Sequence, residues 1–350
     1  MARAKKKLLP KNFTELLEQG DEAALKAVFE ICALDARGGY SKQTALAFNE
    51  FPDALVHWLV AQGADVDAAD TYGETPLHAR AGHWRGRIEP LLALGADVHA
   101  GEGARGTPLH KAAAVGNADT TRLLLAHGAR VDAPNAHGLS PLEHALQGCS
   151  NAKLAEITEV AALLLEAGAA RTPRMTALVE RIGQQFEFHR ANFNPDSVEE
   201  VSAALERLYA LFDVAPVARR AMHDGRAPIV ASGDTWQARH KALWDLLVPS
   251  NGAAATVQGE VIRVSGRLHN ELAGNGGINW DADFRAMADA LLAHLRSGKA
   301  LPAPQLDEAA SLVAQVRRKE GDTLRLCELA EQWVAANPAP AALPTPAYQR

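Results

Sequence analysis

The sequence Gly63-Ala64-Asp65-Val66 recurs as Gly95-Ala96-Asp97-Val98 and again as Gly128-Ala129-Arg130-Val131, at intervals of 32 and 33 residues. A second phrase keeps the same spacing. It reads Thr75-Pro76-Leu77-His78, then Thr107-Pro108-Leu109-His110, and in a weaker form Ser140-Pro141-Leu142-Glu143. Because two separate phrases share one period, the front half of the chain is predicted to be an array of structural repeats.

Each phrase marks one end of a helix. Threonine can cap a helix start, and proline at the first helical position loses no hydrogen bond, so a first helix is predicted after Thr107. A second helix is marked by Leu123-Leu124-Leu125 and is expected to end at Gly128, which can adopt the left-handed conformation. Each repeat is therefore predicted to be a pair of short helices.

The period and the Thr-Pro-Leu-His phrase resemble the ankyrin repeat. The resemblance implies an all-α solenoid, in which His78 and His110 make structural hydrogen bonds between adjacent turns. Four repeats are expected, at residues 38–70, 71–103, 104–135 and 136–170. The first is expected to have a compressed hairpin, and the fourth a longer loop or an extended second helix.

The residues before the first repeat divide into two parts. Residues 1–11 carry Lys5, Lys6 and Lys7 and are predicted to be a basic, disordered terminus. Apolar residues in 12–36 recur at helical spacing and predict two short helices that cap the stack, since an end repeat otherwise exposes its apolar face. Residues 12–170 are thus expected to form one ankyrin domain.

The period disappears after residue 170. Residues 171–336 are predicted to be an α-helical domain, with one or two segments packed on the last repeat. Helices are expected at 197–213, 235–248, 256–272, 281–295, 306–318 and 322–336. Residues 337–350 are rich in Pro and Ala and predict an extended or disordered tail. This half also contains Leu243-Trp244-x-x-Leu247-Val248-Pro249, Thr256-Val257-Gln258-Gly259-Glu260-x-x-Arg263 and Asn275-Gly276-x-x-Asn279-Trp280-Asp281. On these stretches, residues 236–295 resemble a small helical module of unknown function from bacterial proteins, which implies no activity.

Composition argues against several classes of protein. The chain has 350 residues, of which 47% are hydrophobic and 22% charged, and no apolar run is long enough to span a bilayer. A net charge of -6 opposes binding to nucleic acid, which requires clustered positive charge. Three dispersed cysteines, Cys32, Cys149 and Cys327, fit a reducing compartment, so the protein is predicted to be cytoplasmic.

Catalytic motifs are missing from the sequence. The histidines and cysteines lack the spacing of a metal site, and no nucleophile elbow, phosphate-binding loop or dinucleotide fingerprint occurs. We therefore expect neither a metal nor a cofactor, and no enzymatic activity in the repeats.

The ankyrin resemblance implies a partner-binding surface on the concave side of the stack, made of loop tips and first helices. The candidates are Tyr72, Glu74, Arg80, Trp84, Arg105, Lys111 and His137. Aromatic and arginine side chains dominate binding hot spots, which favours Tyr72, Trp84 and Arg105. For Trp84 the alternative is a structural role, filling a gap in the shortened second repeat.

A second candidate site lies in the helical half. Glu260, Arg263 and Arg267 share one face of a predicted helix, because positions three and four apart are neighbours. Nearby in sequence are Gln258, Asn279 and Trp280. These residues could bind a small molecule or peptide, since Arg grips carboxylates and phosphates and Trp can stack. The alternative is an internal ion-pair network with a structural role.

These features predict an interaction module that binds an unidentified protein through the ankyrin surface. The alternative is a ligand-sensing or enzymatic helical domain that the repeats recruit to a target. A third possibility is that the rear half only buries the exposed end of the repeat stack.

Overall fold

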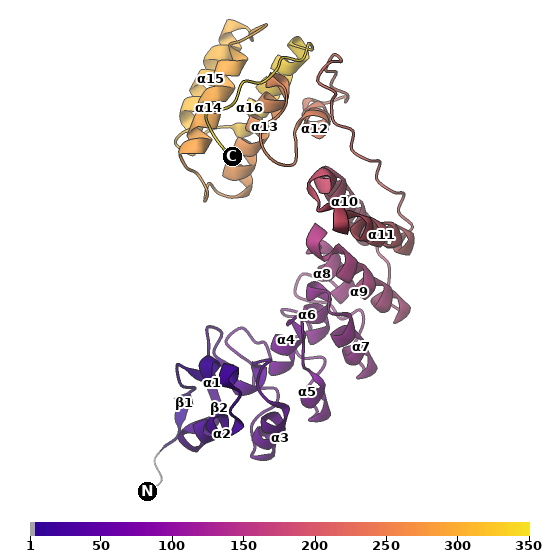
Figure 1. Ribbon diagram of the computed structural model, residues 1–350, viewed down its shortest axis with the longest axis vertical. Coiled ribbons are helices and arrows are strands. Elements are labelled where there is room, and N and C mark those ends of the chain that lie inside the picture. The colour runs from indigo at the N-terminus through magenta and orange to yellow at the C-terminus, as the bar shows by residue number, and fades with distance from the viewer. Residues whose placement is uncertain (1–3) are drawn as a thin grey trace. The chain divides into compact units, whose positions relative to one another are not determined.

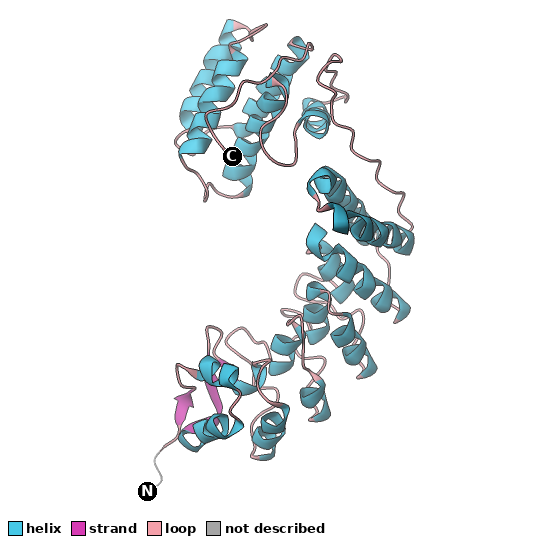
Figure 2. Cartoon of the chain, viewed as in Figure 1, coloured by secondary structure: helices cyan, strands magenta, loops and turns pink. Residues whose placement is uncertain are grey.

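The computed structural model describes residues 4–350 and is all-α apart from one small sheet (Figures 1 and 2). Two compact units make up the chain. The first comprises Met1–Phe186 with Asn194–Val217, and the second comprises Glu187–Phe193 with Ala218–Arg350. The boundary therefore differs from the one expected at residues 170 and 171, because a further helix pair belongs to the repeat stack.

The N-terminal cap contains both helices and strands. Its helices are α1 (Phe13–Gln19) and α2 (Glu22–Ile31), close to the expected pair. Its strands are β1 (Lys6–Leu8), β2 (Cys32–Gly38) and β3 (Gln43–Thr44), in the order β1-β2-β3. β1 pairs parallel to β2, and β2 pairs antiparallel to β3.

The strand β1 corrects the expectation of a disordered end at residues 1–11, as far as residues 4–11 are concerned. Lys6 lies opposite Cys32 and Leu8 opposite Arg37, while the Lys5 ammonium donates to the Phe29 carbonyl at 2.7 Å. Leu9 is buried behind the strand. The sequence does not predict this strand, because its lysines are followed by only two apolar residues and the strand that pairs with it lies more than twenty residues later. Residues 1–3 of the expected terminus lie outside the described part.

Paired helices follow one another along the repeats, and Figure 1 shows the pairs stacked. The first repeat has only a 3-10 turn at Ala45–Ala47 before α3 (Asp53–Ala61). The later pairs are α4 (Pro76–Ala81) with α5 (Glu89–Ala93), α6 (Pro108–Val115) with α7 (Ala118–Ala126), and α8 (Pro141–Gln147) with α9 (Leu154–Glu166). The compressed first hairpin and the extended second helix of the fourth repeat both match expectation.

The recurring phrases form the helix starts as predicted. Thr75 and Thr107 are N-cap residues, each followed by proline at the first helical position. Gly128 has a φ of 83° where the chain turns after α7. In this left-handed conformation a side chain would be strained, which explains why glycine closes the second helix.

A fifth helix pair continues the stack. α10 (Pro173–His189) was not expected, whereas α11 (Pro195–Phe212) matches the predicted helix at 197–213. α11 packs against α9, and the Thr158 hydroxyl of α9 reaches the Ala204 carbonyl at 3.3 Å. The Thr172 hydroxyl donates to Glu143 of α8 at 2.8 Å. The pair thus covers the end of the last repeat.

The second unit is a helical bundle. Its helices are α12 (Trp236–Leu247), α13 (Val257–His269), α14 (Ala282–Leu295), α15 (Ala303–Val316) and α16 (Thr323–Ala336). Each coincides with a predicted helix to within a few residues. α13 packs against α12, α14 and α16, so it forms the centre of the unit. The core around it includes Leu268, Met287, Leu329 and Trp333.

The tail at residues 337–350 is extended but ordered, which excludes the disordered alternative. Gln258 fixes it on both sides, donating to the carbonyls of Asn337 and Ala339 and accepting from the Ala341 amide. Tyr348 is buried against the core of the second unit. The proline and alanine content explains why the tail is not helical, and the buried Tyr348 side chain attaches it to the second unit.

Candidate functional site

A groove of about 910 Å³ runs along the loop tips and first helices of the repeats. Five of the seven predicted partner-binding residues line it. They are Tyr72, Glu74, Arg105, Lys111 and His137, joined by residues that were not predicted, among them His144 and Gln147. The groove lies wholly within the first unit.

Local hydrogen bonds fix the shape of the loop tips. The Asp70 carboxylate accepts from the amides of Tyr72 (2.7 Å) and Glu74 (3.0 Å). Two repeats later the Asn135 side chain accepts in the same way from His137 (2.9 Å) and Leu139 (3.1 Å). Such turns hold the backbone in one conformation, so the side chains of the tips start from a defined position.

Neighbouring tips are also bonded to one another. The Thr71 amide donates to Ser41 at 3.0 Å, and the Gly103 amide donates to Pro134 at 2.8 Å. These bonds join the first repeat to the second and the second to the third. A partner that lies across the groove therefore meets a connected surface and pays little to order it.

The histidines of the recurring phrase connect consecutive repeats through hydrogen bonds beneath this surface. The Nδ1 atom of His110 accepts from the Thr107 amide at 3.0 Å, and its Nε2 atom lies 3.0 Å from the Leu139 carbonyl of the next repeat. His78 makes the same pair of contacts with Thr75 and Gly106. Burial lowers the pKa of both rings, so both are neutral near pH 7. The structural role implied by the resemblance is what the geometry shows.

One side chain per repeat projects from the tips. Tyr40, Tyr72, Arg105 and His137 follow each other at intervals of 32, 33 and 32 residues. The rings of Tyr40 and Tyr72 stack with centroids 6.4 Å apart, and the Arg105 guanidinium lies 4.9 Å from the centre of the Tyr72 ring. Tyr40 was missed in the sequence, although the period counted back from Tyr72 leads to it. Its side chain is 92% exposed.

The charges in the groove are unevenly satisfied. Lys111 of α6 is ion-paired with Glu74 of the preceding repeat. Arg105 has no ion pair among the described residues and is exposed, so it can receive a carboxylate from outside. The Nδ1 atom of His144 is buried without a hydrogen-bond partner in the described part of the chain. Arg105 is therefore open to a bound partner, whereas the His144 Nδ1 atom is shielded from solvent.

Two predicted groove residues lie elsewhere, and the prediction for Arg80 is wrong. Arg80 is fully buried, and its guanidinium donates to the carbonyls of Leu46 (2.8 Å) and Arg87 (3.0 Å). Desolvation lowers its pKa to about 10. Because the first repeat has only a 3-10 turn, its carbonyls need a donor from the second repeat, and Arg80 supplies it.

Trp84 is neither in the groove nor a filler of a gap. It lies in the turn after α4, is 66% exposed, and has the Arg85 guanidinium 4.0 Å from its ring centre. The side-chain amide of Asn117, from the next repeat, instead donates to the carbonyls of His83 (3.3 Å) and Trp84 (3.2 Å) in this turn.

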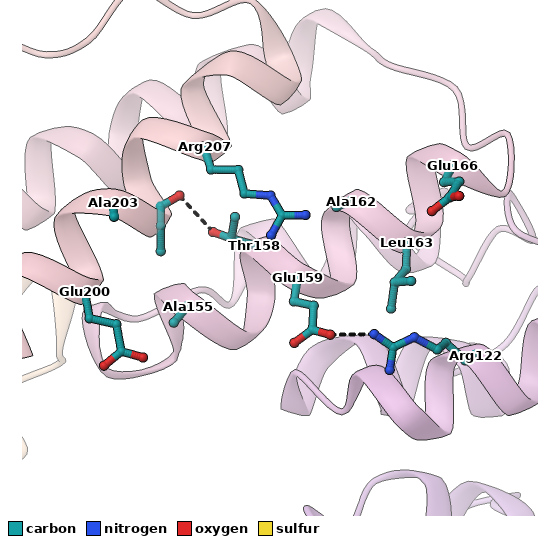
Figure 3. A pocket seen from close by; sticks show the side chains of 11 residues that line it. Arg122, Ala155, Thr158, Glu159, Ala162, Leu163, Glu166, Glu200, Ala203 and Arg207 are labelled. Carbon is teal, nitrogen blue, oxygen red and sulfur yellow. Dashed lines mark hydrogen bonds and ion pairs between the residues drawn. The ribbon is translucent and has the colours of Figure 1, made fainter.

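A second hollow of about 440 Å³ lies where α7, α9 and α11 meet. Figure 3 shows Arg122 reaching from α7 to Glu159, at 2.5 Å, and Arg207 extending from α11 above Thr158. Arg122 also binds Asp119 at 2.7 Å. Since much of its charge is paired within the chain, this hollow serves the packing of the stack more than it offers a site.

The predicted polar cluster of the second unit is mostly internal. Arg263 donates to both carboxylate oxygens of Glu260, at 2.6 and 2.8 Å, and the Tyr348 hydroxyl donates to the same carboxylate at 2.7 Å. Burial opposes ionisation of Glu260, but these hydrogen bonds hold its pKa below the usual value. The structure thus gives Glu260 and Arg263 the alternative role, that of a buried ion-pair network.

The other members of the cluster separate. Gln258 binds the tail, Asn279 binds Glu271 through its amide at 2.7 Å, and Trp280 stacks on Phe284 with ring centroids 5.2 Å apart. The Nε1 atom of Trp280 is buried without a hydrogen-bond partner in the described part of the chain. Arg267 has neither an ion pair nor a side-chain hydrogen bond among the described residues, and it lines a hollow described below.

Comparison with known proteins identifies one part of the chain. Residues 91–145 match the family model described as ankyrin repeats in many copies. No curated protein matched the chain. Among residues 4–350, no helix is long and apolar enough to cross a membrane.

Proposed function

We propose that this chain, which contains ankyrin repeats, binds a protein partner through the groove formed by its loop tips and first helices. Ankyrin repeats generally mediate interactions between proteins and are typically non-catalytic. The observation that carries the proposal is that Tyr72, Arg105 and His137 line one groove on tips that are bonded to each other. Stacks of this kind present extended concave binding surfaces.

The chemistry of the groove indicates what a partner offers. Arg105 has no acidic partner among the described residues, and Tyr72 presents an exposed aromatic face beside it. A partner segment with a carboxylate next to an apolar side chain would satisfy both. We further propose that binding takes place in the cytoplasm, because three buried, unpaired cysteines suit a reducing compartment.

The test is affinity capture with two matched double variants. Tyr72→Ala with Arg105→Ala removes one aromatic and arginine pair from the groove, whereas Trp84→Ala with Arg85→Ala removes such a pair from outside it. We expect the groove variant to lose partners that the wild type and the control retain, with recovery lower by at least about tenfold. Truncating a hot-spot residue costs about 2 kcal/mol or more of binding free energy, which is enough for a loss of this size. If both variants retain the same partners, the groove is not the binding surface.

A further inference from the structure

A hollow of about 280 Å³ lies in the second unit at the junction of α12 and α13. Trp244, Val248 and Pro249 give it an apolar wall, while Ser250, Arg267 and Asn270 supply polar groups. Its size is near the lower end of small-molecule pockets, which are mainly apolar with a few placed polar groups. Phe188 and His189, from the short segment that belongs to this unit, complete the lining.

The charge around this hollow is positive. Among the described residues that line it, Arg263 and Arg267 carry charge and no aspartate or glutamate is present. Arg263 is satisfied by Glu260 and by the Arg350 carbonyl at 2.6 Å. Arg267 is partly buried and has no partner within the described chain. A partly desolvated cation without a counter-ion is unfavourable, so an anion in this position would be stabilised.

Two further observations point the same way. Burial and the nearby charges of Arg263 and Arg350 lower the pKa of Arg267, because they disfavour its charged form by more than the Glu260 carboxylate favours it. In addition, α13 passes after His269 into a π-helical turn at Asn270–Gly274, and Asn270 lines the hollow. Turns of this kind occur frequently at functional sites.

The aromatic wall of the hollow, formed by Trp244 and Phe188, indicates which chemical groups can lie against it. The Trp244 ring lies against the backbone of Gly266, where an added Cβ would approach it to 2.5 Å. The ring of Phe188 stacks on Trp244 with centroids 6.4 Å apart. This wall is apolar, so it suits a flat or apolar group rather than a fully hydrated ion.

We propose that this hollow is a binding site for a small organic anion, whose carboxylate or phosphate group pairs with Arg267 and whose apolar body contacts Trp244. Arg267 recognises the charge, and Ser250 and Asn270 add hydrogen bonds. The site is independent of the ankyrin groove. It would let the second unit respond to a metabolite while the repeats hold a protein.

The test is calorimetric titration of the full chain with four probes of one series. Benzoate and phenyl phosphate carry an anion on an apolar ring, benzyl alcohol has the ring without charge, and inorganic phosphate has the charge without the ring. We expect at least one of the two ring anions to bind, and benzyl alcohol and inorganic phosphate to bind at least about tenfold more weakly. The stronger of the two ring anions identifies the acidic group.

Matched variants place the binding at Arg267. Arg267→Gln removes the charge and keeps the length of the side chain, and Arg296→Gln makes the same change at an exposed arginine outside the hollow. The first should weaken binding of the ring anion at least about tenfold and the second should leave it unchanged. Because Arg267 makes no bond within the described chain, the first variant should also unfold at the wild-type temperature or above it.

Three results would overturn the proposal. Neither ring anion binds the wild type, or Arg267→Gln binds them as the wild type does, or Arg267→Gln unfolds at a lower temperature, which would give Arg267 a structural role. None of these outcomes depends on the capture experiment at the ankyrin groove, so the two proposals succeed or fail separately.

Discussion

A buried histidine is a connector between repeats only while it is neutral. The Nδ1 atom of His110 must accept from the Thr107 amide, and its Nε2 atom must donate to the Leu139 carbonyl. A second proton on the ring would remove the acceptor. Burial keeps the ring neutral by lowering its pKa, and the same holds for His78 one repeat earlier.

This chemistry predicts a loss of stability in acid. The pKa of His110 is lower in the folded chain than its unfolded value near 6.5, so the unfolded chain binds more protons as the pH falls. The stabilisation is therefore full above about pH 6.5 and declines below it. We expect His110→Gln to cost about 1 to 3 kcal/mol at pH 7.5, because buried groups lose their partners, and to flatten the decline between pH 7 and 5.

Hydrogen exchange of the α6 amides measures both effects locally. The exposed His127 lies in the same repeat, so His127→Gln serves as a control that should change neither the stability nor its dependence on pH. An unchanged slope in His110→Gln would mean that this ring does not titrate with unfolding.

Single residues also mark the limit of what the sequence could predict. The period located Tyr72, Arg105 and His137, because loop tips recur with the repeat. It placed Arg80 on the binding surface for the same reason, yet the first repeat is irregular and its Leu46 and Phe51 carbonyls accept from the guanidinium. Periodicity predicts where a residue lies in an ideal repeat, but the loss of one helical turn next to it decides whether its side chain faces solvent.

At the scale of elements, the ends of a repeat stack need different neighbours from its middle. The cap that precedes the first repeat in the sequence combines α1 and α2 with three strands. The last repeat is covered by α10 and α11, with Leu205 and Leu208 of α11 buried. These helices are longer than those of the repeats and lack the Thr-Pro-Leu-His phrase, so the period could not reveal that they belong to the stack.

The position of this end cap predicts the outcome of truncation. A fragment ending at residue 170 exposes the faces of α8 and α9 that α10 and α11 cover, and it should aggregate or unfold at a lower temperature. A fragment ending at residue 217 keeps the cap and should remain monomeric. Light scattering and thermal unfolding of the two fragments compare them directly. Equal behaviour would show that α10 and α11 contribute nothing to the stack.

At the scale of the whole molecule, the two units differ in how their polar groups are used. The repeat stack leaves Arg105 exposed along a groove, with no ion pair among the described residues. The second unit turns most of its predicted polar cluster inward, where Glu260, Arg263 and Tyr348 join α13 to the tail. Sequence spacing brought Glu260 and Arg263 onto one face of a helix, but it could not show that residues 337–350 return to cover that face.

The buried network predicts that the two units can be destabilised separately. Arg263→Ala leaves the Glu260 carboxylate buried without its main partner, and breaking such a pair costs about 3 to 5 kcal/mol. We expect the unfolding transition of the second unit to move to lower temperature, while hydrogen exchange in α6 and α8 of the first unit stays at the wild-type rate. Arg296→Ala, at an exposed position of the same unit, should change neither the unfolding temperature nor the exchange rates. Equal acceleration of exchange in both units would show instead that they unfold as one cooperative body.

The same network predicts a dependence on pH. The pKa of Glu260 in the folded chain lies below its usual value, so the stabilisation by its carboxylate is present above the unfolded pKa and is lost as the pH falls through the folded pKa. The difference in unfolding free energy between Arg263→Ala and the wild type should therefore become smaller in acid.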